Sequence, residues 1–331
     1  MKVASRYAGA LVALVVLAGS VVLSLSVPLR SDLQFWVIVT SFVPWAVLSY
    51  LLALVLFLLV RRGASATLRR LVTVAAVLSL LGVGLHVAWL APSYVGEHPG
   101  GEPDLTVLGF NMLVGQADLG ATTRLVEREN PDVIVLTEAT PEAVQALAAN
   151  GIGGPGSRWP HQGGNPLPSI SGTVVLSAYP LSGEARLDID TGTHRMRVEA
   201  PTPFWLTAVH TTQPLNGNAL WRHDFGLLAA DTREVEGPHI VMGDFNATLD
   251  HGRMRDLLET GLHDAAVEAN SGWQPTWPKP GYRKIAGLPV PVRLMAIDRV
   301  LVSEEFSAVS TSVHSVPDTD HDAIVARLVM R

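Results

Sequence analysis

Three long runs of apolar residues occupy the first 92 positions of the chain. Residues 7–29, 33–60 and 71–92 contain no Asp, Glu, Lys or Arg, and Pro44 with scattered Ser and Thr interrupts the second run. Each run reaches the roughly 20 residues that a helix needs to cross the hydrocarbon core of a bilayer. None has a polar face, as a helix at the surface of a soluble domain would. The pattern predicts a membrane anchor, residues 1–92, with three transmembrane helices.

The first run has an alternative interpretation. Lys2 and Arg6 give it the charged start of a cleaved signal peptide. Two further apolar runs follow at once, and this favours a retained helix.

The remainder of the chain alternates strand-like and helix-like segments after a Pro- and Gly-rich linker at residues 93–104. Strands are predicted at residues 105–110, 132–137, 172–177, 194–199, 204–210, 239–242, 297–303, 309–315 and 323–330. Helices are predicted at 118–130, 141–149, 219–234 and 252–260, and long loops at 150–171 and 271–291. Many strands with a few interspersed helices predict an α+β domain over residues 105–331, with two packed sheets and helices outside.

Basic residues indicate how the anchor is oriented. Lys2 and Arg6 precede the first run, and the segment 61–70 contains four arginines, whereas Arg30 and Asp32 cancel between the first and second runs. Positively charged loops stay in the cytoplasm. We therefore expect a multi-pass cell-membrane protein with a cytoplasmic N-terminus and an extracytoplasmic domain.

Charge is distributed unevenly between the two parts. Of the 24 Lys/Arg and 30 Asp/Glu residues, seven basic and one acidic residue precede residue 93, so 17 basic and 29 acidic residues follow, a net charge of −12. Such a domain repels a long phosphate polymer unless a basic groove or a bound metal intervenes, which makes nucleic acid a less favoured partner. The absence of cysteine fits an exported domain.

Five predicted strands or turns finish on a carboxylate, carboxamide or imidazole side chain. These residues are Asn111, Glu138, His210, Asp244 with Asn246, and Asp320 with His321. A single example would be ordinary turn chemistry, because Asn and Asp form local hydrogen bonds at strand ends. Five in one domain indicate a functional site instead.

The segments around these residues resemble the endonuclease/exonuclease/phosphatase superfamily of metal-dependent phosphoesterases. The matching segments, in the family's order over residues 105–330, are GFN at 109–111, PDVIVLTE at 131–138, GTVVLSAYPL at 172–181, AVH at 208–210, GDFN at 243–246, IDRVLVS at 297–303 and TDHDAI at 319–324. GDFN followed by a late DH pair is the specific part. The resemblance implies a four-layer αββα sandwich, and the three-helix anchor resembles actinobacterial teicoplanin-resistance membrane proteins of the VanJ type in architecture.

The resemblance implies a metal site formed by three of these residues. Glu138 would be the principal ligand of Mg²⁺, for which Mn²⁺ can substitute, and Asn111 would lie beside it. Asp320 would lie near the metal or the leaving group. Mg²⁺ prefers one or two carboxylates and keeps several waters, which agrees with this set.

The resemblance also implies an apparatus for attack on phosphorus. Asp244 would orient or deprotonate a water molecule, and Asn246 would donate its amide hydrogens to a phosphate oxygen. His321 would contact the phosphate oxygens, with Asp298 on its other ring nitrogen, and His210 would bind phosphate. Whether Asp244 or His321 is the base stays open at this point.

Two positions depart from the family pattern, and three further residues have simpler interpretations. Ala178 stands where a basic residue is frequent, and Arg299 where His or Tyr is common, so the pocket edge is expected to differ. His86 lies in the third apolar run without a carboxylate partner in any run. His239 is expected at the surface, and Trp277 is expected to pack at the domain edge.

Three functions compete at this stage. The first is a membrane-anchored phosphoesterase acting on a lipid-linked phosphate, such as a phospholipid head group or a polyprenyl-phosphate cell-wall precursor, with a possible consequence for teicoplanin resistance. The second is an anchored, exported nuclease acting on extracellular DNA. The third is an inactive, phosphate-binding membrane scaffold. The lipid bilayer is the expected partner, and no protein partner is predicted.

Overall fold

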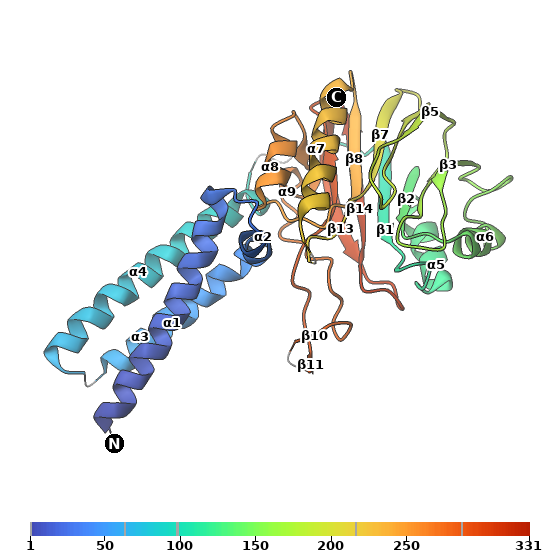
Figure 1. The fold of residues 1–331 in the computed structure, drawn as a ribbon. Coiled ribbons are helices and arrows are strands. Elements are labelled where there is room, and N and C mark those ends of the chain that lie inside the picture. Colours follow the sequence, from blue (N-terminus) through green and yellow to red (C-terminus); the bar gives the residue numbers. More distant parts are fainter. Residues whose placement is uncertain (1, 63, 97–98, 216, 286) are drawn as a thin grey trace. The chain divides into compact units, whose positions relative to one another are not determined.

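A computed structural model describes residues 2–62, 64–96, 99–215, 217–285 and 287–331 (Figure 1). The chain divides into two compact units. Residues 1–92 with 250–252 form the first unit, and residues 93–249 with 253–331 form the second.

The first unit is helical. Its elements are α1 (Lys2–Leu29), α2 (Gln34–Thr40), η1 (Val43–Trp45), α3 (Ala46–Arg61) and α4 (Ala66–Leu90), followed by η2 (Ala91–Ser93). Among the residues that the structure describes, three stretches are long and apolar enough to cross a membrane: Ser5–Leu29, Val43–Arg61 and Ala66–Ser93. The predicted number of potential spanning helices is therefore confirmed.

Two predicted helix boundaries in this unit are wrong. The second run is not one helix from residue 33 to 60, because α2 ends at Thr40 and the next helical segment begins at Val43, with Pro44 in its first turn. A proline lacks the N–H that a helix interior requires and is tolerated in a first turn. The third helix starts at Ala66 rather than at 71, since the Ser65 side chain accepts a hydrogen bond from Leu68 N at 3.4 Å.

Hydrogen bonds between side chains connect α1, α3 and α4. Ser24 Oγ lies 2.8 Å from both Tyr50 Oη and His86 Nε2, and Ser20 Oγ lies 2.7 Å from Ser49 Oγ. His86 is therefore a hydrogen-bonded residue of the helix bundle, as interhelical polar residues in membranes usually are.

The second unit contains two six-stranded sheets. Sheet A has the order β13-β14-β1-β2-β4-β3, and sheet B has the order β5-β6-β7-β8-β12-β9. Sheet A consists of β1 (Leu105–Asn111), β2 (Val133–Thr137), β3 (His161–Asn165), β4 (Thr173–Ser177), β13 (Phe306–His314) and β14 (Ala323–Met330). Sheet B consists of β5 (Leu181–Arg186), β6 (His194–Val198), β7 (Phe204–His210), β8 (His239–Asp244), β9 (His263–Asp264) and β12 (Asp298–Val302).

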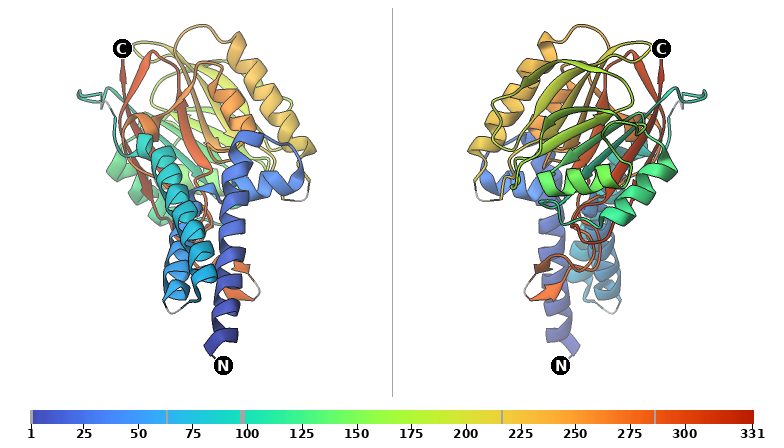
Figure 2. Two further views of the ribbon diagram at one scale, coloured as in Figure 1. Left: turned by 90° about the vertical axis from the view of Figure 1, so that its left-hand side faces the viewer. Right: turned by 90° about the vertical axis from the view of Figure 1, so that its right-hand side faces the viewer.

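Three helices cover the outer faces of this sandwich: α5 (Leu119–Glu129), α6 (Pro141–Ala149) and α7 (Ala219–Glu234). Helices α8 (Gly252–Leu258) and α9 (Ala265–Glu268) follow β8, and Ala265 of α9 belongs to the core between the sheets. Helices α5 and α6 lie on one side of the two sheets and α7 on the other (Figure 2). The predicted α+β sandwich of two mixed sheets flanked by helices is confirmed.

Alternation along the strands explains the layers. On β1, Val107 belongs to the apolar core between the sheets, whereas Leu108 and Phe110 belong to a second core that includes Leu125 of α5 and Leu147 of α6. Successive side chains of a strand point to opposite faces, so an apolar strand can serve both cores.

The central pair in each sheet is parallel, β1 with β2 and β7 with β8. Helix α5 connects the first pair and α7 the second, as a crossover between parallel strands requires. In sheet A, β14 pairs antiparallel with β1, and β4 pairs antiparallel with β2. In sheet B, β6 pairs antiparallel with β7, and β12 pairs antiparallel with β8. The two halves therefore share one arrangement although the sequence shows no repeat.

The two predicted long loops each contain a short piece of sheet. Strand β3 lies within 150–171 and pairs with β4 at the sheet edge, and the hairpin of β10 (Lys284–Ile285) and β11 (Leu288–Pro289) lies within 271–291. The sequence of β3, HQGGN, has no apolar alternation, so periodicity could not reveal it.

The expectation that His239 lies at the surface is wrong. This first residue of β8 is 2% exposed, and its Nε2 lies 2.9 Å from Thr207 Oγ1 of the neighbouring strand. Burial lowers the pKa of His239 to about 3, so the imidazole is neutral.

Candidate active site

The polar residues predicted at strand ends meet where the parallel strands finish. Asn111 is the last residue of β1, and Glu138 directly follows β2. His210 and Asp244 are paired residues at the ends of β7 and β8. Asp298 begins β12 directly opposite Asp244. The carboxyl ends of parallel strands are the usual place for ligands in such sheets.

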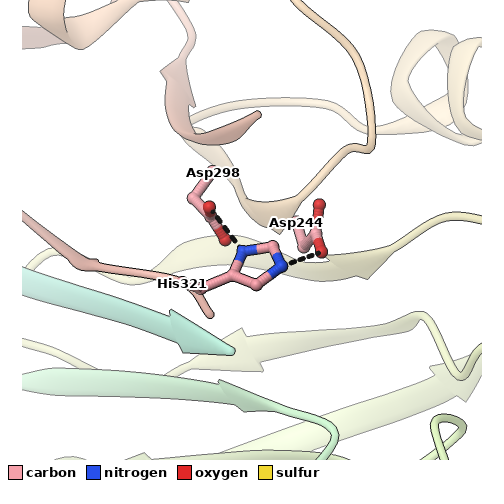
Figure 3. A group of neighbouring side chains, drawn as sticks. All are labelled: Asp244, Asp298 and His321. Carbon is pink, nitrogen blue, oxygen red and sulfur yellow. Dashed lines mark hydrogen bonds and ion pairs between the residues drawn. The ribbon is translucent and has the colours of Figure 1, made fainter. Parts of the chain in front are cut away.

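A buried triad is formed by Asp244, His321 and Asp298 (Figure 3). His321 Nδ1 lies 2.9 Å from Asp298 Oδ2, and His321 Nε2 lies 3.7 Å from Asp244 Oδ2. The contact to Asp298 is a hydrogen bond, which holds the imidazole with Nε2 directed at Asp244. The sequence expectation that Asp298 serves the second ring nitrogen agrees with this geometry.

Asn111 connects two carboxylates. Its Nδ2 donates to Glu138 Oε1 at 3.1 Å and to Asp244 Oδ2 at 3.0 Å, while its Oδ1 accepts from Leu113 N at 2.9 Å. Glu138 Oε2 accepts from Val114 N at 3.0 Å. Glu138 and Asp244 are thus neighbours although they belong to different sheets.

Backbone conformation places two of these side chains. Glu138 has φ of 53° and Asn246 has φ of 46°, the left-handed region that is uncommon for residues with a Cβ. Such residues are concentrated at functional sites. Gly243 has φ of 135°, and a Cβ there would lie 2.1 Å from Val209 O of the adjacent strand. The glycine of GDFN is therefore required by the close approach of β7.

His210 and Asn246 border the same centre. His210 Nε2 lies 3.8 Å from both Glu138 Oε1 and Asp244 Oδ2, beyond hydrogen-bond range. Asn246 N donates to Asp244 Oδ1 at 2.8 Å, and one amide hydrogen of Asn246 donates to Thr211 O at 2.9 Å. Within the described part of the chain, its second amide hydrogen has no other acceptor.

Asp320 approaches the centre from the turn before β14. Its Oδ1 lies 4.0 Å from His321 Nε2 and, among the residues that the structure describes, has no hydrogen-bond partner. The side chain is only 6% exposed. A buried acceptor without a donor is costly, and such a group is often completed by a ligand.

Electrostatics separate the roles of the two residues that compete as base. Burial raises the pKa of Asp244 to about 7, and the neighbouring Asp298 carboxylate contributes to this rise as the second cause. Burial alone would lower the pKa of His321, but the carboxylates of Asp298 and Asp244 raise it to about 10. Burial lowers the pKa of His210. At neutral pH His321 is therefore a cation, whereas Asp244 can exchange a proton.

The donor set fits a hard divalent cation on the Glu138 side. Glu138 offers a carboxylate of the kind that Mg²⁺ and Mn²⁺ take, and the Asp244 carboxylate lies close by. Asn111 presents its amide N–H₂ to both carboxylates, so its oxygen, which accepts from Leu113 N, would have to turn to ligate an ion. Asp244, Asp298 and His321 also lie close enough to share an ion. Both ring nitrogens of His321 already face carboxylates there, so the Glu138 side is the better place.

Some residues of the site were not recognised from the sequence. Thr319 Oγ1 donates to Asn111 O at 3.0 Å and accepts from His321 N at 3.2 Å. Trp277 Nε1 donates to Asp320 Oδ2 at 3.0 Å. Trp277 therefore lies at the site, beyond the packing role expected from the sequence. The TD preceding H in TDHDAI is the only sequence signal that could have indicated Thr319.

Arg299 does not form the pocket edge that its position suggested. Its guanidinium forms a buried ion pair with Asp264, Nη1 to Oδ2 at 2.8 Å. Asp264 also caps α9 by accepting from Val267 N at 3.0 Å. The ion pair of Arg299 with Asp264 thus connects β12 to the start of α9.

The fold is that of the DNase I-like class, and the family comparison agrees. Residues 108–321 match the Endonuclease/Exonuclease/phosphatase family, and the chain belongs to it. No curated protein matched the chain.

Solved structures with this fold are similar over most of their length. An endonuclease/exonuclease/phosphatase from Beutenbergia cavernae DSM 12333 is 19% identical, with 69% of this chain and 72% of that chain covered and a TM-score of 0.52. TDP2 from C. elegans is 15% identical, with coverages of 83% and 92% and a TM-score of 0.53. D. rerio TDP2 complexed with single strand DNA product is 13% identical, with coverages of 68% and 99% and a TM-score of 0.54. At these identities the likeness concerns the fold.

Proposed function

We propose that the chain is a membrane-anchored, extracytoplasmic, Mg²⁺-dependent phosphoesterase that hydrolyses a lipid-linked phosphate ester or pyrophosphate. The observation that carries the reaction is the placement of Asp244 between His321 Nε2 and the Asn111 amide. A carboxylate with a pKa raised to about 7 can accept a proton near neutral pH, and an imidazolium beside it can stabilise phosphate oxygens.

The residues divide the reaction as follows. Asp244 accepts a proton from water while the water oxygen bonds to phosphorus and the bond to the leaving-group oxygen breaks. His321, held by Asp298, donates a hydrogen bond to the developing negative charge. Asn246 and His210 line the same centre and contact the phosphate oxygens. Asp244 is thus the base and His321 the cationic donor in this proposal.

Glu138 is the residue that would hold the metal, with Asn111 beside it. A bound Mg²⁺ supplies neutralisation of phosphate charge and stabilisation of the leaving alkoxide. Asp320 completes the acidic border next to the leaving group.

The membrane anchor is the reason for proposing a lipid-linked substrate. Three helices that are long and apolar enough to cross a membrane belong to the same chain as the domain. Tethering raises the effective concentration of a substrate that resides in the same bilayer. A polyprenyl-phosphate cell-wall precursor or a phospholipid head group has the required chemistry. Teicoplanin resistance would follow if the enzyme altered the precursor pool, and this role rests on architecture alone.

A nuclease is the second candidate. The structure of D. rerio TDP2 with a single strand DNA product gives a relative of this fold that binds nucleic acid. The net charge of −12 after residue 92 opposes a long phosphate polymer, so this candidate ranks below the first.

Phosphate release by the detergent-solubilised full chain would test the proposal. We expect hydrolysis of a polyprenyl diphosphate or a phospholipid that requires Mg²⁺ and exceeds hydrolysis of DNA. Preferential cleavage of DNA would support the nuclease. No release from any substrate, with metal present, would support the inactive scaffold.

A further inference from the structure

The segment that connects α9 to β12, residues 269–297, is fastened to both sides of the candidate site. Thr276 N and Trp277 N donate to Met295 O at 2.8 and 3.0 Å, just before β12 begins. Asp322 N donates to Thr276 O at 3.0 Å, next to His321. Backbone bonds to two elements of the site hold Trp277 in a fixed position.

Trp277 forms a wall beside the reacting residues. Its ring centroid lies 6.4 Å from that of His321, with 49° between the planes. Its Nε1 donates to Asp320 Oδ2 at 3.0 Å. The other oxygen of Asp320 faces His321 Nε2, the same nitrogen that faces Asp244. Asp320 therefore lies between the centre and Trp277.

Arg283 contacts the Trp277 ring. Its guanidinium carbon lies 5.2 Å from the centroid of the Trp277 ring, and its Nη2 donates to Asp320 Oδ2 at 3.1 Å. The Arg283 side chain is 54% exposed, whereas Asp320 is 6% exposed. Contact with the aromatic face and the hydrogen bond to Asp320 restrict the guanidinium, and exposure leaves donors accessible from outside.

We propose that Arg283, stacked on Trp277, binds a second anionic group of the substrate, one phosphate beyond the scissile bond. The proposal deepens the proposed function and rests on it. A planar guanidinium in a fixed orientation matches two oxygens of a phosphate. Without it, the Asp320 carboxylate would repel an anionic leaving group, and Arg283 together with the Trp277 N–H offsets that charge. The substrate class is a diphosphate ester.

The reaction on such a substrate balances simply. The water oxygen bonds to the terminal phosphorus, and its proton passes to Asp244. The bridging P–O bond breaks, and the bridging oxygen leaves with the monophosphate ester, which Arg283 holds. The products are inorganic phosphate and a lipid monophosphate.

Two substrates distinguish this subsite from a purely structural ion pair. Farnesyl diphosphate carries the second phosphate, whereas bis-para-nitrophenyl phosphate has no second phosphate and releases para-nitrophenolate. The full chain in detergent is compared with Arg283→Met, which keeps the length of the side chain, and with Arg283→Lys, which keeps the charge without the planar fork. Arg158→Met is the control, because Arg158 forms a similar exposed ion pair with Asp132, at 2.8 Å.

We expect Arg283→Met to raise KM for farnesyl diphosphate by about tenfold or more, the scale of a lost hydrogen bond to a charged group. KM for bis-para-nitrophenyl phosphate should rise by a clearly smaller factor than KM for farnesyl diphosphate, because that substrate loses only the compensation of Asp320. Arg283→Lys should lie between the wild type and Arg283→Met. Arg158→Met should match the wild type on both substrates, and all variants should keep the wild-type melting temperature.

The outcomes separate the two proposals. Equal losses on both substrates would show that Arg283 only neutralises Asp320, and would overturn the subsite while hydrolysis stands. Wild-type hydrolysis of bis-para-nitrophenyl phosphate without hydrolysis of farnesyl diphosphate would also overturn it. Failure of the wild type on both substrates would overturn the proposed function instead.

Discussion

The carboxamide of Asn111 donates to Asp244 Oδ2 at 3.0 Å and thereby joins the end of β1 in one sheet to the end of β8 in the other. The same nitrogen donates to Glu138 Oε1 at 3.1 Å. Two carboxylates from different sheets are therefore held by one amide group. The site exists only where the two sheets pack, and this explains why its residues are dispersed over more than 200 positions of the chain.

Asp244→Asn is expected to remove activity without unfolding the domain. The substitution is nearly isosteric and eliminates a carboxylate that is 2% exposed and lies opposite Asp298, so the melting temperature should change little. Loss of a general base lowers turnover by roughly 10²–10⁴-fold. Phosphate release at saturating substrate measures the effect, with exposed Asp188→Asn as the matched control. Near-normal turnover would make Asp244 structural and favour a binding module.

Chelation is expected to abolish hydrolysis, and Mg²⁺ or Mn²⁺ is expected to restore it. The reason is the Glu138 carboxylate, a hard oxygen ligand beside the Asp244 carboxylate. Activity is measured after EDTA treatment and dialysis, followed by titration with each ion. Full activity in excess chelator, or rescue by zinc alone, would rule out this metal site.

Glu138→Gln should differ from Asp244→Asn in its response to metal. Removing one ligand charge weakens cation binding, so the Mg²⁺ concentration for half-maximal activity should rise and high Mg²⁺ should restore part of the rate. A rate loss that no concentration of Mg²⁺ relieves would place Glu138 in the chemistry rather than in metal binding.

The second unit is expected to face away from the cytoplasm. Arg61 and Arg62 lie at the end of α3, and Arg69 and Arg70 lie in the first turns of α4, which leaves a short basic connection. A reporter active only outside the cytoplasm should work when fused after Arg331 and should fail when inserted at residues 62–65. The reverse pattern would return cytoplasmic phosphate compounds to the range of substrates.

Stability should fall in mild acid because of His239. Its pKa in the folded protein is about 3, below the value of 6.5 for an unperturbed imidazole. As the pH falls below 6.5, the unfolded chain binds the proton first, so the stabilising contribution present above 6.5 is lost progressively toward pH 3. The slope is at most about 1.4 kcal/mol per pH unit.

His239→Gln should reduce this dependence, since the amide can still hydrogen-bond to Thr207 but does not titrate. The measurement is the melting temperature of wild type and variant between pH 7 and pH 5. His223→Gln, on the exposed face of α7, serves as control and should behave as the wild type. Identical acid losses in wild type and His239→Gln would contradict the prediction.

Local pattern determined many elements of the second unit. The predicted bounds of α6, α7, β7 and β14 coincide with those of the structure. Each has a local signal: for example, Pro141 and the side chain of Thr140, which accepts from Ala143 N at 3.2 Å, define the start of α6. Apolar runs likewise predicted three helices that could span a membrane, because length and hydropathy are properties of the segment itself.

Elements that depend on pairing rather than on their own composition were missed. Strand β3 exists because it pairs with β4, and the hairpin β10–β11 because its two short strands face each other. In the same way His239 looked like a surface residue, yet Thr207 of the neighbouring strand provides its partner. The periodicity of a segment does not indicate which strand or side chain it will pair with.

The sequence by itself determined which chemical groups end the strands, since GDFN, the glutamate after DVIVLT and the late DH pair are local motifs. Only the tertiary structure decided how they act together. It directed His321 Nε2 at Asp244. Burial raised the pKa of Asp244, and the carboxylates of Asp298 and Asp244 raised the pKa of His321 against the opposing effect of burial. It also brought Trp277 and Arg283 to Asp320. Distance and desolvation are properties of packed side chains, so no single segment of the chain can specify them.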